Sequence, residues 1–491
     1  MASMIYAHYR YAAVSGLLMG LAFLHPFFWW GGILGIALFL VSLSQGVRVR
    51  DAGVLGLIAG TLKMLIAFSG LWAVYPLDWL GDFNRTLQLF GIGIVWILAS
   101  MIIGAAFGAF ACVATWVRLH PYRYLLLGGA LVLSEILGSI LFSVVMYGPG
   151  GDINAHLSIG YLGYTLARHG VLGFFAIGTG VYTLSCVVLC LGLLLMEQIE
   201  KARMVAVPTY HSYRKPLLMI FVLLVTYFLP LHPSVDGGIS VATIHTAFPN
   251  TLETTGEEKA ARVGYLIDTF EASLQTESDV IVFPETIGGL RVFGGDANVF
   301  NFIKKHTASD VVVVDSDTVP NDMSMAIRAR VYDTSTKRVH EVYKHYLVPN
   351  GEFLPYTVHA LIYLFGGKEV ASVLDERLAY AQADAVVSEA DQAVPAVLFC
   401  SESLSPYAAA VAREKTMPLI VHPISHAWFD TPTFFWYQLD LMLRTQVRMT
   451  RTPLAVAANM GHPFAYDAFG NPVVGETVYE TASTSVVVYE L

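Results

Sequence analysis

The chain has 491 residues, of which 55% are hydrophobic and only 14% are charged, and its mean hydropathy is +0.57. A protein that is soluble over its whole length is not this apolar, so part of the chain must face a membrane. The formal net charge of −9 at pH 7 excludes the basic surface that is typical of nucleic-acid binding.

The apolar residues are concentrated in the first half of the chain. Nearly all long apolar runs lie before Pro233, whereas most charged residues follow it. We therefore predict two domains, a membrane domain over residues 1–233 and a water-soluble domain over residues 234–491.

Seven apolar stretches in the first domain are candidates for membrane-spanning helices. They cover about residues 11–24, 27–43, 52–75, 87–117, 122–147, 170–196 and 216–231. Each is near or above the length needed to cross a bilayer, although the first two are short. The sequence thus predicts about seven transmembrane helices.

Positive charges are distributed unequally between the loops on the two sides of these stretches. Nine lie at the N-terminus and in alternate loops: Arg10, Arg48, Arg50, Arg118, Arg123, Lys201, Arg203, Arg214 and Lys215. The opposite loops carry only Arg85 and Arg168. Because cytoplasmic loops are enriched in Lys and Arg, the N-terminus is predicted to be cytoplasmic. Seven crossings then place the second domain in the periplasm of a bacterium, with the chain held in the inner membrane.

Two ionisable residues, Lys63 and Glu135, fall inside the apolar stretches. Charges at membrane depth are costly and often functional. The alternative is that each faces the interior of the helix bundle or reaches an interface with its charged end, and the sequence leaves both possibilities open.

From Gly238 onward, short β-branched runs alternate with helical stretches. The predicted strands cover residues 239–245, 279–283, 310–314, 325–332, 394–399, 419–422, 454–458 and 485–489. The predicted helices cover residues 257–275, 298–306, 405–414 and 433–450. Strands that alternate with helices are typical of a layered α/β domain.

Residues capable of acyl-transfer chemistry stand at the ends of these strands. Glu285 follows one predicted strand and Cys400 ends another. Lys344 and Glu352 are eight residues apart and are separated by a Pro-Asn-Gly turn, which breaks any helix. A Glu, a Lys and a Cys that each follow a strand are the groups that catalysis through a thioester requires.

Cys400 is the only cysteine of the second domain. The other three fall inside apolar stretches: Cys112, Cys186 and Cys190. A thiol with no disulfide partner in its own domain is a candidate nucleophile. His422 and His426 are four residues apart, but Pro423 lies between them, and we expect no metal and no other cofactor.

Each of these residues has a predicted role in catalysis. A free thiol is mostly protonated at pH 7, so Cys400 needs a base, which Glu285 can supply. Lys344 can stabilise the oxyanion that forms when the thiolate attacks a carbonyl group. Glu352 and Glu402 would position Lys344 or the incoming nucleophile. The alternative is that Glu285 and Lys344 form a structural ion pair and Cys400 is a buried thiol.

Three motifs follow one another in the second domain: Pro284-Glu285; Lys344 followed by Leu347-Val348-Pro349-Asn350-Gly351-Glu352-Phe353-Leu354-Pro355; and Cys400-Ser401-Glu402. In these motifs the chain resembles the carbon–nitrogen hydrolase (nitrilase) superfamily, and more closely its membrane branch, the apolipoprotein N-acyltransferases. The resemblance implies a multi-pass α-helical membrane bundle followed by an α/β nitrilase-like α-β-β-α sandwich. It also implies a catalytic triad of Glu285, Lys344 and Cys400.

The chain departs from the pattern of this family at three places. His426 stands where the family usually has Asn, Asn350 where it has an aromatic residue, and residues 245–247 where it has a Gln-x-Asn-like motif. A divergent branch associated with plasmid conjugation, the TraB-type conjugal transfer proteins, also resembles this layout.

The resemblance implies a membrane acyltransferase that uses a cysteine thioester. It would move an acyl chain from a phospholipid to Cys400 and then to the N-terminal amine of a lipoprotein. The alternative is a TraB-type relative with the same triad that acts on another amide or acyl substrate. A third reading is a non-catalytic membrane scaffold or transporter. The expected partners are a phospholipid acyl donor, a lipoprotein or other amine acceptor and membrane lipids, without nucleic acid.

Overall fold

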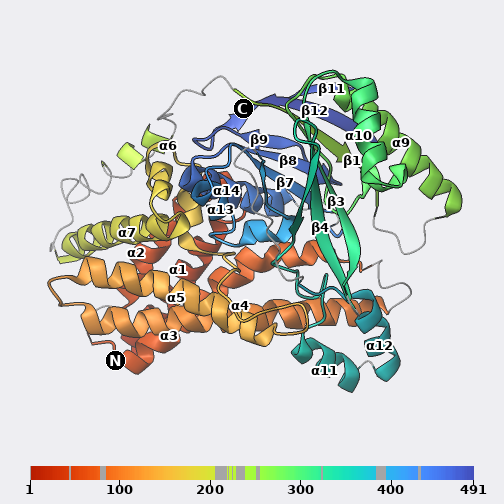
Figure 1. The fold of residues 1–491 in the computed structure, drawn as a ribbon. Coiled ribbons are helices and arrows are strands. Elements are labelled where there is room, and N and C mark those ends of the chain that lie inside the picture. The colour runs from red at the N-terminus through yellow and green to blue at the C-terminus, as the bar shows by residue number, and fades with distance from the viewer. Residues whose placement is uncertain are drawn as a thin grey trace.

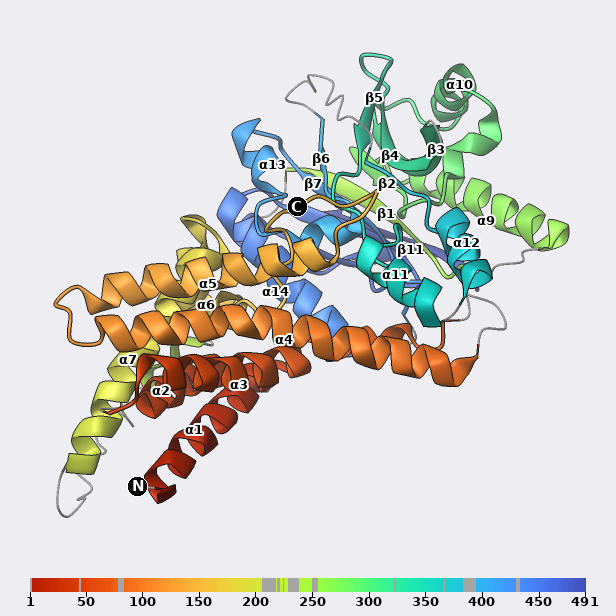
Figure 2. The ribbon, with the colours of Figure 1, turned by 90° about the horizontal axis from the view of Figure 1, so that it is seen from below.

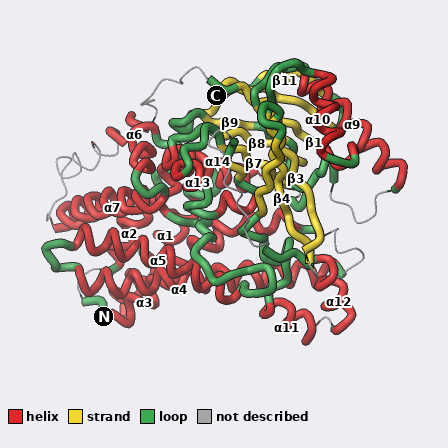
Figure 3. Tube along the Cα trace, viewed as in Figure 1, coloured by secondary structure: helices red, strands yellow, loops and turns green. Residues whose placement is uncertain are grey.

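The computed structural model describes residues 2–43, 46–77, 84–204, 218, 221–223, 225–227, 238–249, 255–321, 324–365, 367–382, 394–429 and 433–491. The described helices of the first half gather on one side of the molecule, and the strands of the second half lie on the other (Figures 1 and 3). The predicted fold class, a helical half with apolar helices followed by an α/β sandwich, is confirmed.

The longer helices of the first half are α1 (Ala2–Leu21), α2 (Gly31–Ser42), α3 (Val49–Ala67), α4 (Arg85–Val117), α5 (Arg123–Val145) and α7 (Val181–Met204). Glycines allow α3 and α4 to pack closely, because a Cβ atom at Gly60 would lie only 2.7 Å from the carbonyl oxygen of Gly104. Such small-residue contacts are typical of helix packing in membranes.

Four helical segments among the described residues are long and apolar enough to cross a membrane, by length and composition alone. They are Val49–Val74, Arg85–Val117, Arg123–Val145 and Val181–Lys201. The apolar helix Pro26–Ser42 is shorter. Most of the predicted stretch 216–231 lies outside the described residues, so seven crossings stay a prediction.

The predicted stretch 170–196 is not one continuous helix. It contains the short helices α6 (Gly170–Gly173) and η5 (Phe174–Ile177) before α7 begins. Gly180 has a φ of +64°, a left-handed conformation that glycine adopts without steric cost. Gly180 therefore interrupts the continuous helix that apolarity alone predicted, just before α7.

The strands of the described residues are β1 (Ser240–Thr246), β2 (Val280–Val282), β3 (Val312–Asn321), β4 (Ser324–Asp333), β5 (Arg338–Tyr343), β6 (Ala396–Val397), β7 (Ile420–Ser425), β8 (Leu454–Asn459), β9 (Phe464–Tyr466), β10 (Pro472–Val473), β11 (Glu476–Glu480) and β12 (Thr484–Glu490). Strands β1, β2 and β3 are parallel and continue through antiparallel β4 and β5. A second group, β6, β7 and β8, is also parallel. The two groups join only at the pairing of Thr246 with Asn459.

The alternation of side chains shows that the two sheets pack face to face. On β8, Ala455 and Ala457 join a core that includes Val241 and Val282 of the other sheet. The residues between them, such as Val456, join a separate core with the helices α13 (Ala410–Glu414) and α14 (Thr433–Thr450). Helices α9 (Gly256–Leu274) and α10 (Asp296–His306) cover the other outer face. The order of layers is therefore α-β-β-α.

Helix α14 also joins the two halves of the chain, lying between the sheets and the first helices (Figure 2). Tyr437 and Leu441 pack against residues of the first half, including Phe23. The Gln438 side chain donates hydrogen bonds to the carbonyl oxygens of Phe23 (3.3 Å) and Ala67 (2.9 Å). These oxygens lie just past the end of α1 and at the end of α3, where backbone carbonyl groups lack partners within the helix.

Candidate active site

Glu285 lies in the turn that follows β2. Its side chain is buried. The next residue, Thr286, has a φ of +57°, and its backbone N–H donates to the Ser316 hydroxyl at 3.2 Å. This tight turn ends the strand and holds the carboxylate of Glu285 inside the domain.

Lys344 follows β5 and is fully buried, with 0% of its side chain exposed. Its backbone N–H donates to the carbonyl oxygen of Ile327 at 2.9 Å and so extends the pairing with β4. The Nζ atom lies 2.9 Å from Glu285 Oε1 and 2.6 Å from Glu352 Oε1. Two of the predicted carboxylates, Glu285 and Glu352, therefore form ion pairs with Lys344.

The turn between Lys344 and Glu352 explains their contact. Asn350 has a φ of +63°, which Asn tolerates better than most residues. The backbone N–H of Glu352 donates to the Val348 carbonyl oxygen, and the Val348 N–H donates back to Glu352 Oε2, at 2.9 and 2.8 Å. The loop thus folds Glu352 back toward the lysine that precedes it.

Cys400 opens the short helix η7 (Cys400–Leu404), just past β6. Its Sγ lies 3.9 Å from the carbonyl oxygen of Ser425, at the end of the neighbouring strand β7. Glu402 accepts hydrogen bonds from the backbone N–H groups of Phe399 (2.9 Å) and His345 (2.8 Å). Glu402 therefore ties the cysteine loop to the lysine loop through their backbones.

Burial and charge together set the protonation of this group. Burial lowers the pKa of Lys344, but Glu285 and Glu352 more than offset it, so the pKa is raised and the ammonium stays charged. Burial raises the pKa of Glu285 to about 7, with a smaller contribution from Glu352 and opposition from Lys344. Burial, and then Glu285, raise the pKa of the Cys400 thiol, against the effect of Lys344. The resting thiol is therefore protonated, beside a carboxyl group that titrates near neutral pH.

Two of the positions where the chain departs from the family pattern, His245 and His426, are buried. His245 accepts from the Ala458 N–H at 3.2 Å and lies 2.9 Å from the Thr243 hydroxyl. His426 packs edge-on against Trp436 at 4.1 Å, and its Nδ1 has no hydrogen-bond partner among the described residues. Within that part of the chain, no group of three His, Cys, Asp or Glu side chains could hold a metal ion.

Two features near the site were not predicted from the sequence. The first is Tyr380, whose backbone N–H donates to the Glu352 carbonyl oxygen at 3.2 Å; burial, and then Glu352 and Glu285, raise the pKa of its phenol. The second is residues 154–158 of the helical half. His156 Nδ1 lies 2.9 Å from the Ser405 hydroxyl, and the Ser158 hydroxyl donates to the Leu404 carbonyl oxygen at 2.6 Å. These pairs are 249 and 246 residues apart in the sequence, and no sequence motif indicates contacts between residues so far apart.

Comparisons with known proteins were made on the sequence and on the structure. No family model and no curated protein matches the sequence. One similar solved structure is a carbon–nitrogen hydrolase from Helicobacter pylori G27, with 11% identity over 51% of this chain and 88% of that chain and a TM-score of 0.34. Another is Nit3 of Saccharomyces cerevisiae, a member of branch 10 of the nitrilase superfamily, with 11% identity over 52% of this chain and 90% of that chain and a TM-score of 0.34. At this identity and score, neither similarity assigns a reaction to the chain.

Proposed function

We propose that the chain is an enzyme that acts on acyl or amide substrates through a thioester at Cys400. The observation that carries the proposal is the fully buried Lys344 ammonium, held at 2.9 Å from Glu285 and 2.6 Å from Glu352. Burying a charge is costly, and a buried charge with perturbed neighbours in this arrangement is a candidate for a catalytic role. Both charged groups affect the Cys400 thiol: Glu285 raises the pKa of the thiol and Lys344 lowers it.

The first half-reaction makes the thioester. Glu285 takes the thiol proton as the Cys400 sulfur attacks the acyl carbonyl carbon. The carbonyl oxygen becomes an oxyanion, which the ammonium of Lys344 stabilises. The tetrahedral intermediate then breaks its bond to the leaving alcohol or amine, which departs with the proton held by Glu285.

The second half-reaction releases the acyl group. An acceptor amine attacks the thioester carbon and gives a proton to Glu285. The carbon–sulfur bond breaks, and the Cys400 thiolate takes this proton back. Glu285 is thus base and acid in turn, which suits a pKa of about 7 at neutral pH.

For the substrates, we propose a phospholipid as acyl donor and the N-terminal amine of a lipoprotein as acceptor. Support comes from the contacts between the site and the apolar helical half. The Thr357 hydroxyl, just past the lysine loop, donates to the carbonyl oxygen of Val145 at the end of α5 at 2.5 Å. A donor embedded in a membrane would need an α/β domain that is held at the ends of such helices.

We further propose that the protein lies in a bacterial inner membrane with its α/β half in the periplasm. The Lys and Arg residues of the alternate loops support this orientation.

A TraB-type relative, with the same triad acting on another amide or acyl substrate, is the second candidate. His245 and His426 stand where the N-acyltransferase pattern has other residues, and this divergence favours the second candidate. The third candidate is a non-catalytic scaffold. It is disfavoured because such a protein would not need a fully buried ammonium group at Lys344.

Mass spectrometry of the purified full-length protein tests the proposal. After incubation with phospholipid, we expect a mass increase of one acyl group, mapped to Cys400. Cys400→Ala should carry no adduct, whereas Cys112→Ala, a matched change at a thiol of the helical half, should carry it normally. An adduct or turnover that persists in Cys400→Ala would exclude the thioester. An adduct that forms only from a small ester or amide would favour the second candidate.

A further inference from the structure

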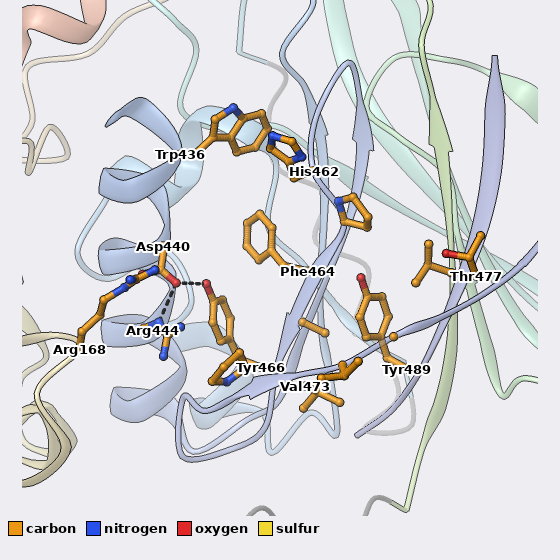
Figure 4. Close-up of a pocket in the computed structure, with 16 residues that line it drawn as sticks. Arg168, Trp436, Asp440, Arg444, His462, Phe464, Tyr466, Val473, Thr477 and Tyr489 are labelled. Atoms are coloured by element: carbon orange, nitrogen blue, oxygen red, sulfur yellow. Dashed lines mark hydrogen bonds and ion pairs between the residues drawn. The ribbon is translucent and has the colours of Figure 1, made fainter. Parts of the chain in front are cut away.

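A cavity of 460 Å³ lies between α14 and the strands β9 to β12 (Figure 4). None of the residues that line it belongs to the group around Lys344. Arg168 comes from the helical half, and all the other lining residues come from the α/β half. Ligand sites of about 300–1,000 Å³ occur preferentially at such boundaries between domains.

One end of the cavity carries charged groups that share a single carboxylate. Asp440 is buried, and its two oxygens lie 2.5 Å from Arg168 Nε and 2.6 Å from Arg444 Nε. The Tyr466 hydroxyl also donates to this carboxylate (Figure 4). Burial raises the pKa of Asp440, but Arg444 and Arg168 lower it further, so the group is ionised. Two guanidinium groups against one carboxylate leave this end with a net charge of +1.

Both arginines contact Asp440 through Nε, which leaves their outer N–H groups for other acceptors. Arg444 uses Nη1 to donate to the Gly470 carbonyl oxygen at 3.0 Å. Among the described residues, no hydrogen bond uses either Nη atom of Arg168. Guanidinium groups bind carboxylate and phosphate oxygens through these atoms, often in pairs.

The rest of the cavity wall is mainly apolar and aromatic. Phe464 lies in the middle of the wall in Figure 4, and Val473 and Tyr489 lie beside it. Val474, which also lines the cavity, is 94% exposed and marks its opening to solvent. A ligand that fits this lining has one anionic end and an apolar body.

We propose that this cavity binds a phosphate-bearing ligand, with the phosphate against Arg168 and Arg444 and any alkyl part along Phe464 and Val473. A phospholipid headgroup and free phosphate share this chemistry. The apolar wall favours the lipid, because burying an attached alkyl chain adds hydrophobic binding energy. The site is separate from Cys400, so the proposal does not rest on the proposed reaction.

Calorimetric titration of the full-length protein in a neutral detergent tests the proposal. The probes are inorganic phosphate, dihexanoyl phosphatidic acid and the zwitterionic dihexanoyl phosphatidylcholine. We expect phosphatidic acid to bind most tightly, and Arg168→Gln to weaken its binding at least tenfold, because one of two guanidinium groups is lost. Arg291→Gln is the matched control: Arg291 is exposed, lies 3.6 Å from Asp317 and does not line the cavity, and its loss should leave binding unchanged.

A second variant, at an exposed position, tests the site in case Arg168→Gln fails to fold. Val474→Asp places a negative charge at an exposed rim and should weaken phosphatidic acid binding, while the uncharged Val474→Asn should not. Cys400→Ala should bind as well as the native chain, which separates this site from the triad. Equal binding of phosphate and phosphatidic acid, both reduced in Arg168→Gln, would assign the site to free phosphate. Absence of binding, or binding unaffected by both Arg168→Gln and Val474→Asp, would overturn the proposal.

Discussion

Lys344 carries a charge that is fully buried near the proposed nucleophile, so its ammonium group needs hydrogen-bond partners inside the protein. An ammonium group has three N–H donors, and two of them are used by Glu285 and Glu352. One donor is therefore left for an oxyanion formed at Cys400. The sequence indicated Glu352 as one of two carboxylates that could position Lys344, because a Pro-Asn-Gly turn separates the two residues. It could not predict which carboxylate would bind the lysine and which, like Glu402, would bind backbone N–H groups.

Replacing Lys344 tests its proposed role as the oxyanion partner. Lys344→Met should slow formation of the thioester by roughly 10²–10³, as when a single oxyanion donor is removed. Lys344→Arg should restore only part of the rate, because a planar guanidinium group does not fit the place of a compact ammonium group. Single-turnover measurement of the Cys400 adduct gives these rates directly. An adduct formed by Lys344→Met at the native rate would contradict the role.

The pKa of Glu285 predicts a pH dependence for the first half-reaction. The base must be ionised to take the thiol proton, and burial raises its pKa to about 7. The rate of thioester formation should therefore rise with pH between about 6 and 8 and then level off. Glu285→Gln should remove both this rise and the adduct, because an amide cannot accept the proton. If Glu285→Gln forms the adduct normally, the base is another group, with Glu352 or Glu402 as the next candidates.

Single elements could be predicted from the sequence wherever their burial pattern was regular. Strand β8 alternates between two cores and was predicted, as was the long helix α14. Strand β5 was missed because its sequence is polar, and charge pairs such as Arg328 with Glu341 hold it to β4. Helix α11 (Tyr356–Phe365) was missed as well, since it directly follows a loop motif.

The segment of residues 158–166 shows how the helical half reaches the candidate site. Lys63 Nζ donates to the Gly160 carbonyl oxygen at 2.9 Å. Glu135 accepts from the Leu162 N–H at 2.7 Å and from the Ser185 hydroxyl at 2.8 Å. Both buried charges therefore hold this segment in place inside the bundle. Ser158, at the start of the segment, contacts the helix η7 that begins at Cys400.

This arrangement predicts that Glu135 is a positioning residue. It holds residues 158–166, which in turn contact the helix that begins at Cys400. Glu135→Ala leaves two buried donors without an acceptor, at a cost of about 1–3 kcal/mol each, and should lower both thermal stability and kcat. Glu135→Gln keeps an acceptor oxygen and should recover most of both. Ser134→Ala is the control, because the Ser134 hydroxyl bonds only within its own helix, to Leu131. A native kcat in Glu135→Ala, at a temperature where it is folded, would contradict the positioning role.

The packing of the two halves against each other lies beyond what sequence patterns can predict. Ser158 and Leu404 are 246 residues apart, and Gln438 bonds to Phe23 over 415 residues. Neither pair belongs to a repeat, a motif or an amphipathic period that would signal the contact. The helical and the α/β character of the two halves could be predicted from the sequence, but the contacts between the halves follow only from the folded chain.

The connection between α4 and α5 and the end of α7 lie at the end of the helical half that is away from the strands (Figure 2). Arg118 donates to the Leu43 carbonyl oxygen at 3.0 Å and lies 3.8 Å from Glu200, and Arg123 lies 2.5 Å from Glu197. The ends of α2, α4 and α7 and the start of α5 therefore meet at this end, and the sequence places Lys and Arg residues in the loops that adjoin them. Because such loops face the cytoplasm, the α/β half should face the opposite side.

Labelling of single cysteines in intact cells tests this orientation. In a chain whose four native cysteines are replaced by alanine, Leu119→Cys marks the loop between α4 and α5, where Leu119 is 90% exposed. Arg291→Cys marks the α/β half at an exposed position. A maleimide that cannot cross the inner membrane should label only the cysteine at 291, and permeabilising the cells should allow both to react. Labelling of the cysteine at 119 alone would reverse the topology, and equal labelling of both in intact cells would mean that they share one side of the membrane.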